Sequence, residues 1–298
     1  MKLFVSKIKK FFKPYPKIFK IISLINRLLR IDYAIYKYKR NKYRTRCYNE
    51  YEQGQRIVKK KIGNITSYYE AVSPKNYWHL STGSQNEDSF ADLIFDNCIL
   101  EGMTIFDIGG HTGQYTIPFA KKVGHKGFVY VFEPEQIGYK AIKRNIKINE
   151  LNNVEILDFA ISNKNQDINF YIRPDKDTHS IFKETGSPSL SGKQNVITVK
   201  SYSIDGLLKN NIIKSIPDFI KIDTEGSEIE IIKGAKQTLP FVKLLLIEIH
   251  ADELIRSGYN NPYESVEIEL NKTGFIHQRY LDNIHIIASR KKEYLDFI

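Results

Sequence analysis

The stretch FDIGGHTGQYT, residues 106–116, decides the fold, because an apolar run ends there in an acid and enters a glycine-rich turn. Residues 103–108 (MTIFDI) are typical of a buried strand, and residues 112–123 (TGQYTIPFAKKV) are typical of a helix. A strand, a glycine turn and a helix in this order indicate a nucleotide-type ligand on the turn. The acid is the unusual feature, because it would repel the phosphates that such turns commonly bind.

The same alternation of apolar strands and helices continues along the chain. The predicted strands are 103–108, 127–134, 154–161, 218–223, 242–250, 275–281 and 283–289, and the predicted helices are 86–99, 112–123, 136–149, 227–239 and 262–274. Nearly continuous apolar strands separated by helices predict a parallel sheet covered on both faces. We therefore expect an α/β fold with a mostly parallel seven-stranded sheet and an antiparallel C-terminal hairpin. Residues 163–200 should form short strands and loops.

Acids end the predicted strands. In sheets of this kind, ligands bind beyond the carboxyl ends of the strands, where the strand order reverses. The candidate site residues at these ends are Asp107, Gly109, Gly113, Glu133, Asp158, Asp223, Glu225, Glu248 and His250.

The spacing of the first glycines separates two classes of ligand. The glycines at 109 and 113 do not match the GxGxxG pattern that brings backbone close to a pyrophosphate. An acidic strand end suits a cationic ligand instead. S-adenosylmethionine carries an ammonium and a sulfonium and has no phosphate, and Glu133 at the end of the next strand could accept two hydrogen bonds from its ribose diol. The sequence therefore predicts S-adenosyl-L-methionine as the cofactor and argues against a nicotinamide dehydrogenase.

The block KIDTEGSEIEIIKGA (221–235) is the most specific motif of the chain. With FDIGGHTGQYT, VFEP (131–134) and AIS (160–162), it resembles the FkbM family of S-adenosylmethionine-dependent methyltransferases, over roughly residues 85–290. The resemblance implies the class I Rossmann-like fold and O-methylation of a hydroxyl on a sugar, glycan or related metabolite.

The resemblance also assigns cofactor positions. It implies cofactor contacts at Asp107, Gly109, Gly113 and Glu133, and Asp158 stands where many related enzymes touch adenine. The stretch DTHSIF (177–182) resembles the serine-containing loop of the family.

Methyl transfer to an alcohol needs alignment of the reacting atoms and a group that takes the proton or holds the oxygen. Asp223 ends the fourth predicted strand and is the preferred group for orienting or deprotonating the acceptor, with Glu225 and His250 in support. The preferred interpretation of Glu228 is that its negative charge stabilises the N-terminus of a helix. Asp223, Glu225, Glu248 and His250 could also ligate a divalent ion such as magnesium. No metal-binding motif surrounds them, so we assign no metal ligand from the sequence.

Other functions stay open at this level. A methyltransferase for protein or nucleic acid would keep the cofactor site, and a non-catalytic membrane-binding or partner-binding protein would not need the strand-end acids. The tetrapeptide DTEG (223–226) stands where an Asn-Pro-Pro-aromatic motif would indicate an amine acceptor, which favours oxygen. Nucleic acid is disfavoured as a partner, because the chain after residue 61 is slightly acidic.

The positive charge is confined to the N-terminal part. Residues 1–61 contain 19 Lys/Arg and 3 Asp/Glu, whereas residues 62–298 contain 26 and 31. Apolar residues recur at helical spacing in 3–13 and 18–30, among the basic residues. We therefore predict a basic, amphipathic helical arm over 1–75 and a methyltransferase domain over 76–298.

Charges interrupt both apolar patterns of the arm, so neither is expected to span a bilayer. The arm could bind an anionic membrane surface through residues 1–61, pack on the enzyme body or on a second subunit, or bind nucleic acid through 37–46. With two cysteines, Cys47 and Cys98, and no disulfide pattern, we expect a cytoplasmic protein, at the inner face of the membrane if the arm binds lipid. The sequence does not indicate an oligomeric state.

Overall fold

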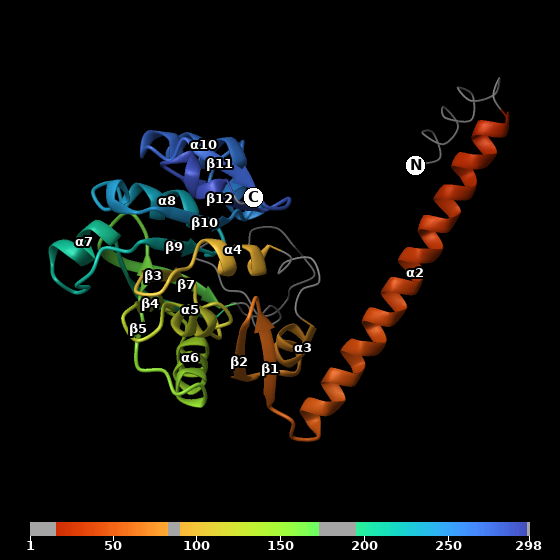
Figure 1. The fold of residues 1–298 in the computed structure, drawn as a ribbon, viewed down its shortest axis with the longest axis horizontal. Coiled ribbons are helices and arrows are strands. Elements are labelled where there is room, and N and C mark those ends of the chain that lie inside the picture. The colour runs from red at the N-terminus through yellow and green to blue at the C-terminus, as the bar shows by residue number, and fades with distance from the viewer. Residues whose placement is uncertain (1–15, 83–89, 173–194, 297–298) are drawn as a thin grey trace. The chain divides into compact units, whose positions relative to one another are not determined.

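The computed structural model describes residues 16–82, 90–172 and 195–296 (Figure 1). The predicted helix at 3–13 and the loop 177–182 with His179 lie outside these ranges. Contacts divide the chain into two compact units, Met1–Gln55 and Arg56–Ile298. The sequence placed this boundary at residue 75, so residues 56–75 belong to the catalytic unit rather than to the arm.

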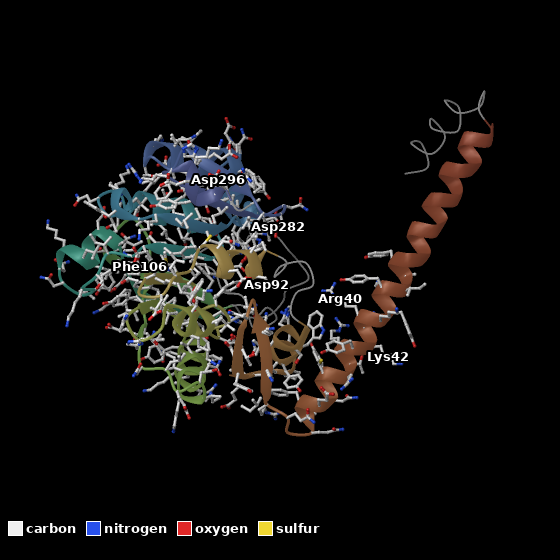
Figure 2. The ribbon with its side chains drawn as sticks, in the orientation of Figure 1. Arg40, Lys42, Asp92, Phe106, Asp282 and Asp296 are labelled. Atoms are coloured by element: carbon white, nitrogen blue, oxygen red, sulfur yellow. The ribbon has the colours of Figure 1, made fainter. Side chains whose placement is uncertain are left out.

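The arm is built on one long helix, α2 (Pro16–Glu52), which starts at a proline as helices commonly do. Side chains of residues 33–46 are exposed, including Arg40 and Lys42 (Figure 2). The prediction of a helical arm up to residue 75 is wrong beyond Glu52. Gly54 adopts a φ of +95°, a conformation that ends helices readily because glycine has no Cβ. Among the described residues, no helix combines the length and apolar character needed to cross a bilayer.

A hairpin replaces the expected end of the arm. Strands β1 (Ile57–Ile62) and β2 (Ile65–Glu70) pair antiparallel across Gly63 and Asn64. The hairpin belongs to the catalytic unit, since β2 lies against α5 (Thr116–Val123) and α6 (Gln136–Ile148). It is also tied to the glycine turn, because the Tyr69 hydroxyl donates a 2.9 Å hydrogen bond to the carbonyl of Gln114.

The central sheet has the predicted seven strands. They are β3 (Thr104–Ile108), β4 (Phe128–Phe132), β5 (Val154–Leu157), β9 (Phe219–Ile222), β10 (Leu244–Glu248), β11 (His277–Tyr280) and β12 (His285–Ser289). Their spatial order is β11-β12-β10-β9-β3-β4-β5, and β12 runs antiparallel to the other six strands of this sheet. This confirms the α/β fold with an antiparallel hairpin at one edge, which is the topology of class I methyltransferases.

Helices cover both faces of the sheet. Besides α2, α5 and α6, the described helices are α3 (Pro74–Thr82), α4 (Ala91–Asn97), α7 (Ile204–Lys209), α8 (Glu228–Lys233), α9 (Ala251–Arg256) and α10 (Pro262–Lys272). Short 3-10 turns lie at Leu239–Phe241 and Lys292–Leu295. One buried cluster joins the sheet to α7, α8 and α10, and a second joins its other face to α4 and α5. This arrangement explains why the strands read as continuous apolar runs.

A second, smaller sheet stands beside the carboxyl edge. It contains β6 (Ala160–Ile161), β7 (Gln166–Ile172) and β8 (Asn195–Tyr202), in the order β6-β8-β7. The prediction of one strand over 154–161 is wrong, because β5 ends at Leu157 and β6 joins the other sheet. Asp158 is exposed at the break. β5 is a partly buried edge strand, so few contacts hold the chain in the central sheet beyond Leu157.

Candidate active site

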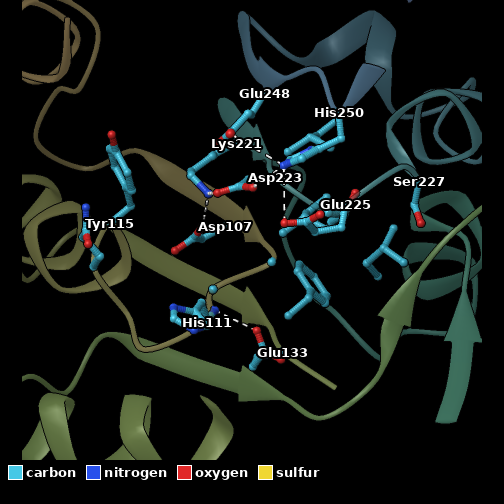
Figure 3. Close-up of a pocket in the computed structure, with 18 of the residues that line it drawn as sticks. Asp107, His111, Tyr115, Glu133, Lys221, Asp223, Glu225, Ser227, Glu248 and His250 are labelled. Atoms are coloured by element: carbon cyan, nitrogen blue, oxygen red, sulfur yellow. Dashed lines mark hydrogen bonds and ion pairs between the residues drawn. The ribbon is translucent and has the colours of Figure 1, made fainter. Parts of the chain in front are cut away.

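The pairing register places a row of polar side chains on one face of the sheet, at its carboxyl edge (Figure 3). Asp107 of β3 pairs with Lys221 of β9, and Glu248 of β10 pairs with His285 of β12. Asp223 follows directly after the last registered pair, Ile222 with Ile247, and lies two residues beyond Lys221, so it extends the same row. Neither Lys221 nor His285 was predicted as a site residue, because only the register between distant strands brings them to the row.

Lys221 holds the two aspartates of this row together. Its Nζ donates a 2.9 Å hydrogen bond to Oδ2 of Asp223 and lies 3.7 Å from Oδ1 of Asp107. Burial would raise the pKa of Asp223, but the charges of Lys221 and His250 outweigh burial and lower it to about 2. Asp223 is thus a carboxylate at neutral pH. Burial raises the pKa of the fully buried Asp107 despite Lys221 and Thr116, whose hydroxyl donates to Oδ2 at 2.5 Å.

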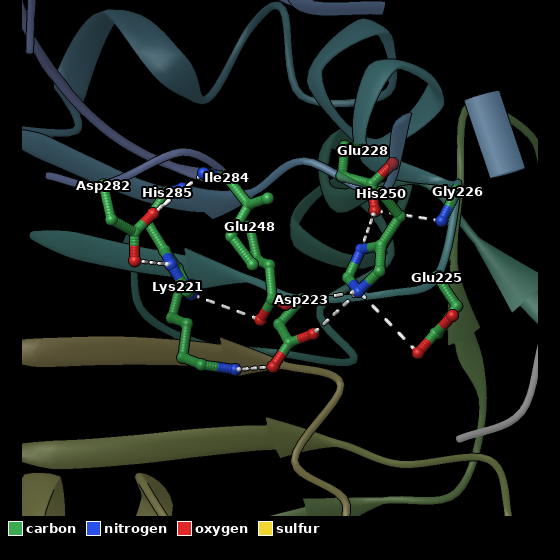
Figure 4. Close-up of polar contacts among 10 residues, drawn as sticks. All are labelled: Lys221, Asp223, Glu225, Gly226, Glu228, Glu248, His250, Asp282, Ile284 and His285. Atoms are coloured by element: carbon green, nitrogen blue, oxygen red, sulfur yellow. Dashed lines mark hydrogen bonds and ion pairs between the residues drawn. The ribbon is translucent and has the colours of Figure 1, made fainter. Parts of the chain in front are cut away.

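His250 lies at the centre of a ring of acids (Figure 4). Its Nδ1 is 2.8 Å from Oε1 of Glu228, the fully buried first residue of α8. Its Nε2 faces Asp223 Oδ1 at 3.8 Å, Glu225 Oε1 at 3.7 Å and Glu248 Oε1 at 3.6 Å. Burial alone would lower the pKa of His250, but its hydrogen bond to Glu228 and the neighbouring carboxylates raise it to about 10.

The structure therefore brings the three predicted catalytic residues Asp223, Glu225 and His250 together. Glu228 has two contacts. It accepts a 2.9 Å hydrogen bond from the Gly226 N–H near the start of α8, and it also orients His250. The signal for this second role was available only in the fold, since Glu228 and His250 belong to different strand–helix units.

A strained backbone directs Glu225 into this ring. Glu225 has a φ of +42° and is followed by Gly226 at +103°. A non-glycine residue with positive φ costs roughly 1–2 kcal/mol. His111, in the turn after β3, shows the same feature with a φ of +50°. Strain of this kind concentrates at binding and catalytic sites, and two of the four described non-glycine residues with positive φ, His111 and Glu225, line the pocket.

The turn after β3 leaves no room for side chains where a ligand would approach. A Cβ at Gly109, whose φ is +84°, would lie 1.9 Å from the carbonyl oxygen of Asp223, and one at Gly110 would lie 2.2 Å from Val131. Gly113 has a φ of +85°, but a Cβ there would meet Ile142 only at 3.5 Å. The turn is thus pressed against the end of β9, which opens a cradle above Asp107.

Glu133 is oriented by the backbone around it. Oε2 accepts a 2.7 Å hydrogen bond from the His111 N–H, and Oε1 accepts one of 2.9 Å from the Glu135 N–H. Burial outweighs these hydrogen bonds and raises the pKa of Glu133 to about 8. Both oxygens keep acceptor capacity, so the carboxylate suits a diol.

These groups line one pocket of about 360 Å³. Glu133 and Asp107 lie on one side of the pocket and the ring around His250 lies on the other (Figure 3), and Gly109 also lines the pocket. Asp107 Oδ1 is buried and makes no hydrogen bond in the described part of the chain, where Lys221 Nζ lies 3.7 Å away, so the cradle offers an acceptor atom to a ligand. These features fit S-adenosylmethionine and do not fit a pyrophosphate.

Asp158, the predicted adenine contact, lies outside the pocket that most of the other candidate residues line. Asp158 is exposed and does not line the pocket, whereas the next residue, Phe159, does. Helix α3 contributes Lys75, Asn76 and His79 to the lining. This part of the chain precedes the region that carried the family resemblance.

Comparison with known proteins agrees with this geometry. The family described as "Methyltransferase FkbM domain" matches residues 107–277. The hexuronic acid methyltransferase AglP of Haloferax volcanii is 28% identical over 153 residues, which are 51% of this chain and 57% of that protein. The chain thus spans little more than half the length of this curated relative.

Solved structures include a SAM-dependent methyltransferase from Aquifex aeolicus, with a TM-score of 0.36, 18% identity and coverage of 66% of this chain and 85% of that one. M. jannaschii TYW2 in complex with AdoMet has a TM-score of 0.37 and 14% identity, covering 79% and 85%. The family match is the more informative finding, because it contains the glycine turn, the second strand-end acid and the whole ring around His250. The chain belongs to the FkbM methyltransferase family, and its methyl donor is S-adenosylmethionine.

Proposed function

We propose that this enzyme methylates a hydroxyl group of a sugar, a glycan or a related small molecule. The ring of Asp223, Glu225 and Glu248 around Nε2 of His250 carries the proposal. An alcohol is a weak nucleophile, and acids at hydrogen-bonding reach of its proton are what such an acceptor requires. An amine acceptor would not need this density of carboxylates.

The residues divide into a binding end and a reacting end. Asp107, Gly109 and Glu133 hold the cofactor, with Gly113 shaping the turn. When bound, S-adenosylmethionine supplies an electrophilic methyl group, whose carbon–sulfur bond breaks as the acceptor oxygen bonds to carbon. Asp223 accepts a hydrogen bond from the acceptor hydroxyl and orients it, and Glu225 receives the proton.

Asp223 provides the test of this division. Asp223→Asn keeps the shape of the side chain but removes the charge that Lys221 holds in place, so turnover should fall about 10²-fold or more. Affinity for S-adenosylhomocysteine, measured by calorimetry, should stay nearly unchanged because the cofactor end is intact. Full activity in this variant would exclude Asp223 from the reaction.

The name of the relative from Haloferax volcanii supports a sugar as the acceptor. Transfer of a tritiated methyl group from S-adenosylmethionine to uronic-acid oligosaccharides, tRNA and protein extract would compare three acceptor classes. We expect label in the oligosaccharide, and it should survive alkali, because methyl ethers of hydroxyls are stable whereas methyl esters of carboxyls hydrolyse. Label only in tRNA or protein would contradict a sugar acceptor.

We also propose that the arm brings the enzyme to the cytoplasmic face of an anionic membrane. The exposed part of α2 supports this, because it presents Tyr33, Ile35 and Tyr36 beside the basic stretch 37–46. Aromatic and apolar residues among Lys and Arg are the composition of an interfacial helix. Such a location would suit an acceptor carried on a lipid.

A further inference from the structure

Asp223, His250 and Glu248 each point one polar side-chain atom toward a common centre (Figure 4). The second polar atom of each side chain contacts a neighbouring residue. Asp223 presents Oδ1, while Lys221 binds its Oδ2 at 2.9 Å. His250 presents Nε2, while Glu228 binds its Nδ1 at 2.8 Å.

Glu248 completes the set. It presents Oε1 to the centre, while Nε2 of His285 lies 3.3 Å from its Oε2. His285 is itself fixed, since its Nδ1 lies 2.8 Å from Oδ2 of Asp282 and Phe90 packs on its ring at 4.6 Å. Ligands oriented by a second layer of carboxylates and cations are the usual construction of a metal site.

The distances also fit an ion better than hydrogen bonds. Nε2 of His250 is 3.8 Å from Asp223 Oδ1 and 3.6 Å from Glu248 Oε1, which is too long for a hydrogen bond. Two ligands of one ion with bonds of about 2.0–2.2 Å lie roughly 3–4.4 Å apart. The three ligand atoms lie within 4.8 Å of one another, so they can share one ion after little movement.

We propose that Asp223, Glu248 and His250 bind one divalent transition-metal ion, with Glu225 within reach of the same ion. One imidazole and two carboxylates suit Mn²⁺ or Zn²⁺ better than an ion that prefers oxygen alone. This inference rests on the proposed function for its chemical meaning: an ion here would orient the acceptor oxygen in place of the direct hydrogen bond to Asp223, and would stabilise the charge left on that oxygen when its proton passes to Glu225. Binding of the ion itself can be measured without any acceptor.

The experiment uses the full chain, stripped of metal with a chelator and titrated with Mn²⁺ while paramagnetic resonance reports the free ion. We expect one bound equivalent per chain, and at least tenfold weaker binding in Glu248→Gln and His250→Gln. Glu228→Gln should weaken Mn²⁺ binding about 10–100-fold, as loss of an orienting partner does elsewhere. Zn²⁺ should displace Mn²⁺ far more effectively than Mg²⁺ does.

Glu230→Gln is the matched control, because Glu230 lies on α8 but pairs with Lys233 and Tyr259 instead of the ring. It should bind Mn²⁺ like the unaltered chain. Every variant must also bind S-adenosylhomocysteine, which shows that it is folded. A chain that binds S-adenosylhomocysteine but no Mn²⁺ at millimolar concentration, or binds it equally in the ligand variants, overturns the metal site and leaves the methyltransferase function standing. Failure to bind S-adenosylhomocysteine would instead overturn the function.

Discussion

Gly109 and Gly113 occupy the same turn and share a positive φ, but they meet different surroundings. Only at Gly109 would a Cβ collide with backbone, the carbonyl oxygen of Asp223 at 1.9 Å. Gly109→Ala should therefore combine backbone strain with overpacking and destabilise the protein by about 2–4 kcal/mol. Gly113→Ala should add only the backbone strain and destabilise the protein by about 1–2 kcal/mol. Urea unfolding of both variants measures the difference, and equal losses would contradict this account of the turn.

Glu133 should make cofactor binding depend on pH. Burial raises its pKa from an ordinary 4.5 to about 8, so its contribution to folding stability is full below pH 4.5 and is lost as the pH rises to 8. The ionised form accepts ribose hydroxyls best. Affinity for S-adenosylhomocysteine should therefore rise about tenfold between pH 7 and 9, following the ionised fraction of Glu133.

Glu133→Gln is the control for this effect, because it cannot ionise but keeps the size of the side chain. The ratio of wild-type to variant affinity isolates Glu133 from the titration of the ligand. A ratio that stays constant between pH 7 and 9 in calorimetry would remove Glu133 from ribose recognition.

Among the elements, the β1–β2 hairpin has the least obvious role, because it lies outside the central sheet yet supports the glycine turn. Tyr69 is fully buried, and its hydroxyl holds the carbonyl of Gln114, which lines the pocket. Tyr69→Phe should cost about 1 kcal/mol of stability through the lost hydrogen bond. Tyr69→Ala should cost about 3–5 kcal/mol, since it also empties the space of the ring. Denaturant unfolding checks both, and a mild Tyr69→Ala would show that the hairpin is dispensable.

The sequence predicted the central sheet well because its inner strands β3, β4, β9 and β10 are almost entirely buried and therefore stand out as apolar runs. The hairpin was missed because the alternating buried positions of β1 are Val58, Lys60 and Ile62, so a buried lysine breaks the apolar alternation, although the Gly63–Asn64 pair is a hairpin signal. In the site, strand-end positions identified Asp223 and Glu225. The partners that fix their geometry depend on which strands pair, and one sequence does not state that.

The positive charge of the whole molecule is concentrated in one of its two units: Met1–Gln55 contains 15 Lys/Arg and 3 Asp/Glu, whereas Arg56–Ile298 contains 30 and 31. A polybasic segment gains about 1 kcal/mol per Lys or Arg near an anionic surface. The full chain should therefore co-sediment with anionic vesicles and be released at high salt, where screening shortens the reach of the charges. Neutral vesicles provide the comparison.

The matched truncation begins at Arg56, because a start near Tyr68 would remove β1 and expose the residues it covers. This chain should stay in solution and still bind S-adenosylhomocysteine, since the three described sheets and the two large buried clusters lie within Arg56–Ile298. If the truncated chain unfolds, or the full chain ignores anionic vesicles at low salt, the arm is a packing element.

The end of α8 has a consequence for how this enzyme can diversify. A Cβ at Gly234 would lie 2.1 Å from the carbonyl oxygen of Ser162, so backbone touches backbone where the helix meets the small sheet. The same 221–235 block therefore holds the acids and anchors the strands whose Phe170 and Ile161 form a pocket wall. A change in this wall that leaves the contact of Gly234 with Ser162 intact should therefore leave the acids in place. The shape of the wall and the position of the acids are thus separated at a single glycine.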